Sequence, residues 1–212
     1  MARAPSSEGK SRLATHFPPD RLHALKVALL ANTLRALETL PDVFIFFTPD
    51  DAERELALLS GPALPRVRQG EGDLGTRMLA AIRHLLETLK YEAALLVGSD
   101  IPWLTADHVR EAMATLHATR GIVLGPADDG GYYLIGMTRA VDGLFEDIAW
   151  GTRNVLTDTL RAAERLGVDA RLIRSAYDVD TIADVQRFER DLAVASADAC
   201  PHLRRWLSTI ST

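Results

Sequence analysis

Three aspartates stand just after predicted strands, where they could share a divalent cation. Asp100 follows the apolar run 93–97, and Asp178 and Asp180 follow a shorter predicted strand at 170–173. Ligands of open α/β sheets bind beyond the carboxyl ends of the strands. Two carboxylates about 4 Å apart repel by roughly 4 kcal/mol at an effective dielectric constant near 20, and the sequence suggests no neighbouring side chain that would offset this.

A divalent cation would relieve this repulsion and would bring phosphates with it. Mg²⁺ commonly binds one or two carboxylates together with substrate phosphates, and Mn²⁺ suits the same ligands. The sequence therefore predicts a site for Mg²⁺ or Mn²⁺ and a diphosphate. The alternative stays open that each acid only stabilises a turn or the N-terminus of a helix.

The N-terminal segment 1–16 carries cationic side chains that could meet such phosphates. Its Gly-Lys-Ser tripeptide is not a P-loop, because that motif needs an upstream glycine and a preceding strand that this sequence does not offer. We expect the segment to be a loop. Its Arg3, Lys10 and Arg12 either close on phosphates or belong to an exposed, disordered arm.

Two glycine-rich segments border predicted elements. Residues 69–75 lead into a predicted helix, and glycines at such a place let a ligand approach free backbone N–H groups. Residues 126–131, with the sequence PADDGG, separate two predicted strands. They fit either a tight hairpin or a binding loop.

Composition excludes several classes of function. The 212 residues carry a net charge of −5, which argues against general nucleic-acid binding. A single cysteine excludes an internal disulfide framework and fits a reducing cytoplasm, and no apolar run is long enough for a membrane span. The scattered histidines predict no zinc site. The motifs of serine hydrolases and of Rossmann dehydrogenases do not occur in the context they require.

Apolar periodicity predicts alternating helices and strands. We expect helices over 20–40, 74–89, 105–118, 153–166 and 201–210, a short one ending near 59 and another after Thr181, with strands over 43–47, 65–69, 93–97, 121–125, 132–137 and 170–173. Thr152 is expected to cap a helix, and Thr181 with Asp184 has the spacing of a capping box. The pattern is typical of a single α/β domain over residues 1–212 with a mostly parallel sheet.

The motifs resemble, in order along nearly the whole chain, a family of small bacterial GT-A-type transferases. The matching segments are 5–13, GDLG at 72–75 with Arg77, GSDIP at 98–102, GPADDGGYYLIG at 125–136, IAWGT at 148–152 and DVDT at 178–181. The family is glycosyltransferase-like and associated with radical-SAM and selenium- or arsenosugar-related genes. Its superfamily, the nucleotide-diphospho-sugar transferases, includes phospholactate guanylyltransferase and the sugar-acid cytidylyltransferases. The resemblance implies a three-layer α/β/α fold.

The resemblance also implies roles for particular residues. Catalytic roles would fall to Lys10, Arg12 and Asp100, and metal binding to Asp100, Asp178 and Asp180. Nucleotide binding would involve Gly70, Asp73, Gly75 and Ser99, and the acceptor side Asp129, Gly130, Gly131 and Trp150. Relatives usually have a hydrophobic first strand before the Arg-Ala-Pro segment, so that either this strand is absent here or the start codon has been placed too late.

The sequence thus predicts a cytoplasmic, metal-dependent transferase that takes a nucleotide or nucleotide-sugar and a small-molecule acceptor. Sugar transfer is the first expectation, because the family resemblance favours it. Nucleotidyl transfer, as in phospholactate guanylyltransferase, is the second, because a cationic N-terminal loop would suit a leaving pyrophosphate. A non-catalytic nucleotide-binding module is the third.

Overall fold

The chain, described over residues 1–210 by a computed structural model, is an α/β protein with two compact units. Unit 1 comprises Met1, Arg68–Gly98 and Ala106–Ala176, and unit 2 comprises Ala2–Val67, Ser99–Thr105 and the chain from Tyr177 onward. The α/β class matches the expectation from the sequence. That all 212 residues form one domain stays a prediction.

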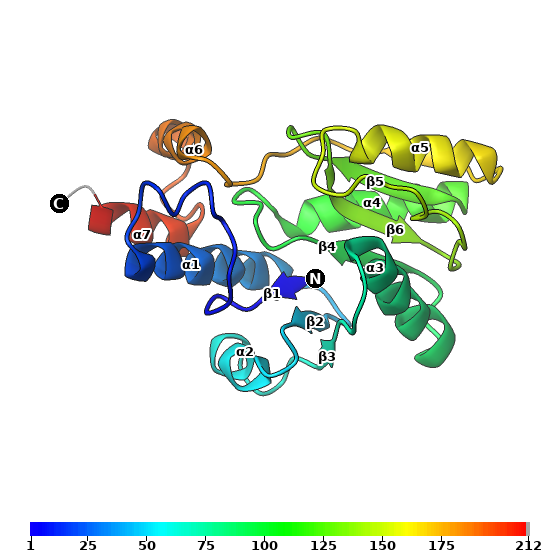
Figure 1. The fold of residues 1–212 in the computed structure, drawn as a ribbon, viewed down its shortest axis with the longest axis horizontal. Coiled ribbons are helices and arrows are strands. Elements are labelled where there is room, and N and C mark those ends of the chain that lie inside the picture. Colours follow the sequence, from blue (N-terminus) through cyan, green and yellow to red (C-terminus); the bar gives the residue numbers. More distant parts are fainter. Residues whose placement is uncertain (211–212) are drawn as a thin grey trace. The chain divides into compact units, whose positions relative to one another are not determined.

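The sheet of unit 1 has four strands in the order β4-β6-β5-β7. These are β4 (Ala94–Val97), β5 (Ile122–Pro126), β6 (Tyr132–Met137) and β7 (Ala170–Leu172). β6 pairs antiparallel with β4 and β5, whereas β5 and β7 pair in parallel. Three of the four strands, β4, β5 and β7, therefore run in one direction. Figure 1 labels β4, β5 and β6 of this sheet.

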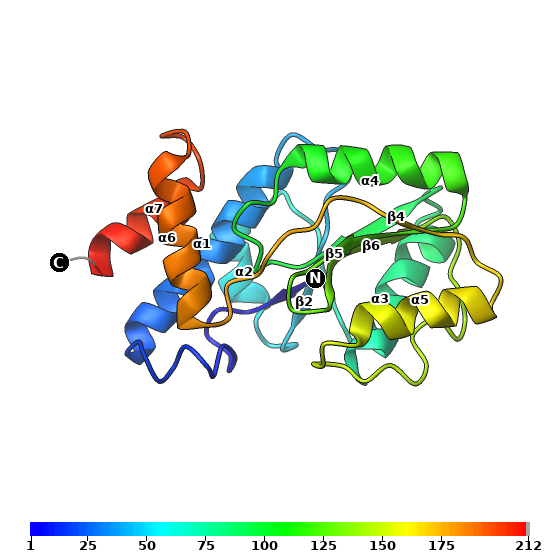
Figure 2. The same ribbon diagram turned by 90° about the horizontal axis from the view of Figure 1, so that it is seen from above.

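Helices cover both faces of this sheet, which explains why β4, β5 and β6 are almost continuous apolar runs. Figure 2 shows the sheet between α4 (Ala106–Thr119) on one side and α3 (Leu74–Arg83) and α5 (Val155–Arg165) on the other. The central residues Leu124 and Leu134 are fully buried. Unit 1 by itself thus has the three layers that the resemblance implied.

The sheet of unit 2 has the order β1-β2-β3. Its strands are β1 (Ala2–Arg3), β2 (Ile45–Thr48) and β3 (Arg66–Arg68), and β1 pairs in parallel with β2. The expectation that the first strand is missing and that residues 1–16 are all loop is therefore corrected: a two-residue strand is present. Ala2 and Ala4 are small enough to be buried in one apolar cluster with Phe47, which holds this strand in place.

Three helices of unit 2 share a second apolar cluster. They are α1 (Pro19–Leu37), α6 (Ile182–Val194) and α7 (Pro201–Ile210); α2 (Glu53–Ser60) packs with β1 and β2 instead. α1 and α7 lie side by side in Figures 1 and 2. Leu25, Phe188 and Leu203, one from each helix, are almost fully buried. No helix within residues 1–210 is both long and apolar enough to cross a bilayer.

Two local expectations are corrected. The helix predicted over 74–89 is regular only to the end of α3 and continues as a π-helical turn, η1 (His84–Thr88). Thr152 does not cap α5, whose N-cap residue is Asn154. The Thr152 hydroxyl instead donates to the Ala149 carbonyl at 2.8 Å, which stabilises the turn before the helix.

Candidate functional site

Asp100 lies on a short segment of unit 2, residues 99–105, that is anchored on both sides. The hydroxyl of Thr33 in α1 donates to the Ser99 carbonyl at 3.3 Å, and Ile101 and Leu104 are buried. The Val179 N–H donates to the Asp100 carbonyl at 3.1 Å. The last contact ties the segment of Asp100 directly to that of Asp180.

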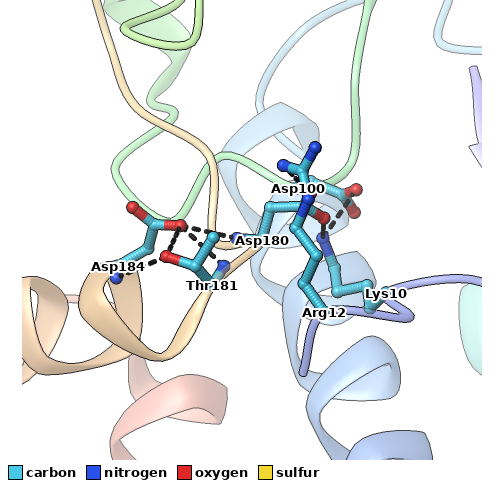
Figure 3. Close-up of polar contacts among 6 residues, drawn as sticks. All are labelled: Lys10, Arg12, Asp100, Asp180, Thr181 and Asp184. Atoms are coloured by element: carbon cyan, nitrogen blue, oxygen red, sulfur yellow. Dashed lines mark hydrogen bonds and ion pairs between the residues drawn. The ribbon is translucent and has the colours of Figure 1, made fainter. Parts of the chain in front are cut away.

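Asp180 is held by the N-terminus of α6. Thr181 is the N-cap residue, and the predicted capping box with Asp184 is confirmed. The carboxylate of Asp184 accepts from the N–H groups of Thr181 at 2.7 Å and Asp180 at 3.1 Å (Figure 3). Val179 is buried, as its alternation with the two flanking acids predicted. The backbone that carries Asp180 is therefore fixed by local hydrogen bonds.

Lys10 joins the two acids. Its Nζ lies 2.9 Å from Oδ2 of Asp100 and 3.5 Å from Oδ1 of Asp180, and Nη1 of Arg12 lies 3.2 Å from Oδ2 of Asp180 (Figure 3). The Lys10 side chain is only 5% exposed, whereas that of Asp100 is 51% exposed. The expectation that no side chain offsets the repulsion between the acids is therefore wrong. We call Lys10, Arg12, Asp100 and Asp180 the acid–lysine cluster.

The N-terminal loop that carries Lys10 is anchored to its surroundings, so the alternative of a disordered arm is wrong. Leu13 is fully buried. The Ser6 N–H donates to Glu55 at 2.9 Å, and Nζ of Lys26 donates to the Ser7 carbonyl at 2.6 Å. The loop turns at Lys10, whose φ of +53° lies in the left-handed region. This turn places the ammonium group against both acids.

Lys26 is a residue that the sequence analysis missed. Partial burial, together with the charges of Lys10 and Arg3, lowers its pKa, although Glu55 and Asp100 act in the opposite direction. Arg3 is also close to this turn, because its side chain passes beside Gly9. The sequence did contain a signal for this residue, because Lys26 is a charged position among the buried leucines of α1. The N-terminal loop thus brings together four cationic side chains, three of its own, Arg3, Lys10 and Arg12, and Lys26 from α1.

The acid–lysine cluster matches the ligand needs of a divalent cation in part. Asp100 and Asp180 already share one positive charge through Lys10, and two carboxylates with substrate phosphates are a ligand set that Mg²⁺ accepts. Within residues 1–210, however, no group of three or more His, Cys, Asp or Glu is placed to hold a metal. The predicted trio with Asp178 does not form such a group. Metal binding through Asp100 and Asp180 stays a prediction.

The nucleotide-binding residues predicted at 70–75 lie in unit 1, and their loop is held by close packing. Asp73 is the N-cap of α3 and accepts from the Thr76 N–H at 2.8 Å. Hydrogen bonds from Thr76 lower the pKa of Asp73.

A Cβ on Gly75 would lie 2.7 Å from Cβ of Phe145 and 2.8 Å from the ring of Trp150. Gly75 and Trp150 therefore touch, although the resemblance gave them different roles. The exposed Gly70 takes a φ of +76°, which favours glycine.

The predicted acceptor-side residues 129–131 lie in the connection between β5 and β6, which is a hairpin, and their role on the acceptor side stays a prediction. The carboxylate of Asp129 accepts from the Gly131 N–H at 2.8 Å. Gly130 has a φ of +93°, and a Cβ there would lie 2.2 Å from the Arg153 carbonyl oxygen. These residues therefore have structural reasons for their identity. We call residues 70–75 and 129–131 the glycine loops.

Comparisons with known proteins place the chain in a family. A family model described as "Uncharacterized protein conserved in bacteria (DUF2064)" matches residues 29–152. The "Phosphoenolpyruvate guanylyltransferase" of Sphaerobacter thermophilus is 32% identical over 201 residues, which cover 91% of this chain and 92% of that protein. The matched range of the family model includes Asp100 and the glycine loops, and the alignment with the guanylyltransferase extends over most of the chain.

Solved structures agree on the fold. A crystal structure of a "putative nucleotide-diphospho-sugar transferase" from Desulfovibrio desulfuricans G20 is 28% identical, with a TM-score of 0.87 over 96% of this chain and 91% of that chain. A cytidylyltransferase from Leptospira borgpetersenii has a TM-score of 0.54 at 14% identity, over 86% of this chain and 82% of that chain. The predicted nucleotide-diphospho-sugar transferase-like fold is confirmed. The particular GT-A family and its radical-SAM association stay predictions.

Proposed function

We propose that this chain, which belongs to the bacterial DUF2064 family, transfers a nucleotidyl group from a nucleoside triphosphate to a small anionic acceptor. That the chain is a transferase follows from its relatives, among them a guanylyltransferase and a nucleotide-diphospho-sugar transferase. The relative from Sphaerobacter thermophilus supports GTP as donor and phosphoenolpyruvate as acceptor. Sugar transfer, the first expectation from the sequence, becomes the second candidate.

The observation that carries this proposal is the charge of the N-terminal loop. Four cationic side chains gather around residues 3–12, and the buried ammonium of Lys10 faces Asp100 and Asp180. Phosphate oxygens are favoured by such an arrangement, because hydrogen bonds between charged partners are stronger than neutral ones. A triphosphate carries enough negative charge to need several of these groups. The loop therefore suits a leaving pyrophosphate.

The proposed reaction is a displacement at the α-phosphorus. An acceptor oxygen forms a bond to the α-phosphorus of GTP, the bond from that phosphorus to the bridging oxygen breaks, and pyrophosphate leaves with the electron pair. Phosphoenolpyruvate offers anionic phosphate and carboxylate oxygens, so no side chain has to remove a proton. Lys10 and Arg12 would neutralise the charge that develops on pyrophosphate.

A divalent cation, held by Asp100 and Asp180 together with the phosphates, would add Lewis-acid stabilisation of the same charge. The residues of this chain would bind and orient the triphosphate, since the cluster is fixed by the capping box of α6 and by the anchored N-terminal loop. Such orientation contributes by holding the reacting groups in a productive geometry.

Pyrophosphate release tests the proposal. Purified protein with GTP, phosphoenolpyruvate and Mg²⁺ should release pyrophosphate, and Asp100→Asn should reduce the rate by about a hundredfold. A matched control is Asp142→Asn, an exposed acid of unit 1 that pairs with Arg83 at the surface; it should retain activity. Binding of GTP without any turnover would support the third expectation, a non-catalytic module, and would contradict the proposal.

Sugar transfer is supported by one specific observation, the TM-score of 0.87 with the nucleotide-diphospho-sugar transferase of Desulfovibrio desulfuricans. The same assay separates the two reactions. A panel of nucleotide sugars in place of GTP would yield free nucleoside diphosphate if a sugar is transferred. Release of nucleoside diphosphate without any pyrophosphate from GTP would favour this second candidate.

A further inference from the structure

A pair of aromatic residues bridges the two segments that carry the site aspartates. Trp103 stands three residues after Asp100, and Tyr177 stands three residues before Asp180. Nε1 of Trp103 donates to the Tyr177 hydroxyl at 2.7 Å. The bridge is additional to the backbone contact in which the Val179 N–H donates to the Asp100 carbonyl. The two segments are therefore joined at two points.

The Tyr177 hydroxyl continues this bridge to α6. It donates to Oδ2 of Asp191 at 2.7 Å while it accepts from Trp103, so both of its hydrogen-bonding functions are used. Burial, followed by the hydrogen bond to Asp191, raises the pKa of Tyr177 well above its usual range.

Ring contacts hold the bridge rigid. The guanidinium carbon of Arg187 lies 3.8 Å from the centroid of the Tyr177 ring, and the ring of Trp103 lies 5.4 Å from that of Phe188. Arg187 and Phe188 belong to α6, the helix whose capping box fixes Asp180. The segment of Asp100 is thus attached through Trp103 to the helix that fixes Asp180, and through the Asp100 carbonyl to Val179 just before that helix.

We propose that Tyr177 is a positioning residue that sets the separation between the carboxylates of Asp100 and Asp180, and thereby the seat of Lys10 between them. The consequence for turnover rests on the proposed function, whereas the consequence for Lys10 does not. A hydroxyl that only stabilises the fold would lower stability without changing how Lys10 is held or how fast bound substrate reacts.

Tyr177→Phe is the variant that separates these roles. It keeps the ring on Arg187 and removes the hydroxyl that Trp103 and Asp191 share. Tyr133→Phe is the matched control, because Tyr133 is equally buried and its hydroxyl donates to the Arg174 carbonyl at 3.1 Å within unit 1. Asp191→Asn keeps an oxygen that can accept from Tyr177 and should behave like the wild type.

The first measurement does not depend on activity. Acetylation of lysines by a soluble succinimidyl ester, followed by peptide mass spectrometry, reports how tightly Lys10 is held, with the exposed Lys90 as internal reference. In Tyr177→Phe the rate at Lys10, relative to Lys90, should rise at least about fivefold, because the opened cluster exposes the amine more often. Tyr133→Phe should leave the ratio at the wild-type value. An unchanged ratio in Tyr177→Phe would overturn the proposal.

The second measurement is the split between kcat and KM for pyrophosphate release from GTP. Misplaced catalytic groups lower the rate of the bound substrate more than its binding, so Tyr177→Phe should lower kcat about tenfold with KM for GTP changed less than about twofold. Wild-type kcat in Tyr177→Phe, or an equal loss in Tyr133→Phe, would contradict the inference. If the wild type has no turnover but the Lys10 ratio rises as expected, the proposed function fails and the positioning role stands.

Discussion

The acid–lysine cluster of unit 2 and the glycine loops of unit 1 are held by different forces. In the cluster, charged side chains from three separate segments meet, and Lys10 lies between two carboxylates. In the glycine loops, the backbone is packed so closely that glycine leaves no room for a Cβ: Gly130 lies against the Arg153 carbonyl, and Gly75 lies against the ring of Trp150. Both regions were predicted to bind substrates: the cluster the phosphates, residues 70–75 the nucleotide and residues 129–131 the acceptor.

Substitutions in the two regions should therefore have different effects. A charged contact that is partly exposed contributes modestly to stability but can matter greatly to a reaction in which charge develops. A glycine that packs against another part of the backbone carries no charge that could act on a substrate. Any larger residue at that position would force the neighbouring backbone to move. We therefore expect substitutions in the cluster to lower activity first and substitutions in the glycine loops to lower stability first.

The largest expected effect is that of Lys10→Met on activity. The variant removes the charge that would face the phosphates and leaves the carboxylates of Asp100 and Asp180 without their shared partner, so kcat/KM for pyrophosphate release should fall at least about a hundredfold. Steady-state kinetics checks this. Lys90→Met, at an exposed lysine of unit 1, should retain wild-type kinetics. Equal kinetics in the two variants would contradict the expectation that substitutions in the cluster lower activity first.

The next effect is that of Gly130→Ala on stability. The alanine Cβ would have to displace the Arg153 carbonyl and hold a φ of +93°, so the free energy of unfolding should fall by about 3 kcal/mol. Gly151→Ala isolates the backbone term, because Gly151 has a φ of +79° with nothing within 4 Å of its Cβ position. It should cost about 1–2 kcal/mol. Urea denaturation compares them, and equal losses would show that crowding at Gly130 is unimportant.

A smaller effect is expected from Thr181→Ala in the capping box. The variant removes the hydroxyl that accepts from the Asp184 N–H, which should lower the free energy of unfolding by about 1 kcal/mol. Thr157→Ala, on the exposed face of α5, should be neutral or slightly stabilising because alanine is the better helix former. Asp180 directly precedes this cap, so a loss of stability without any loss of activity would show that the position of Asp180 does not depend on the cap.

The smallest effect concerns pH and the buried His108 of unit 1. Burial, followed by the charge of Arg174, lowers its pKa, and its ring packs edge-on against Tyr133. The unfolded chain therefore binds the proton of this histidine more readily than the folded chain does. Above pH 6.5 the histidine is neutral in both states and does not reduce the free energy of unfolding, which should decrease as the pH falls below that value. Urea midpoints at pH 7.5 and 5.5 measure the decrease. His108→Phe, which cannot take up a proton, should reduce it, and an unchanged decrease would contradict the assignment.

Most elements of the fold could be predicted because their signals are local. The apolar runs of β4, β5 and β6 fill a sheet with helices on both faces, and the spacing of Thr181 and Asp184 defines a cap without reference to the rest of the chain. The two-residue strand β1 carries no such pattern, since nothing in Ala2 and Arg3 marks a strand. It forms because β2 offers a parallel edge.

The site could be predicted only in part, because its key contact is not local. Lys10 and Asp100 are 90 positions apart, and no periodicity in the sequence says that the ammonium group lies between two acids. The sequence therefore suggested only a metal as the source of positive charge between the acids, whereas in the structure Lys10 supplies part of that charge. It also could not reveal that Asp73 and Asp129 make local hydrogen bonds in turns, since a cap and a ligand use the same residue type.

The sharing of one ammonium by two carboxylates has a consequence for how this protein can change in evolution. Replacement of Asp100 or Asp180 leaves Lys10 with a partner, whereas replacement of Lys10 removes the charge that both acids share and leaves Asp180 with Arg12, so the effects of these substitutions cannot be additive. A neutral residue at position 10 would be tolerated best in a lineage that had already lost one of the acids. Natural drift at the three positions should accordingly follow a preferred order, with epistasis between sites that are far apart in the gene.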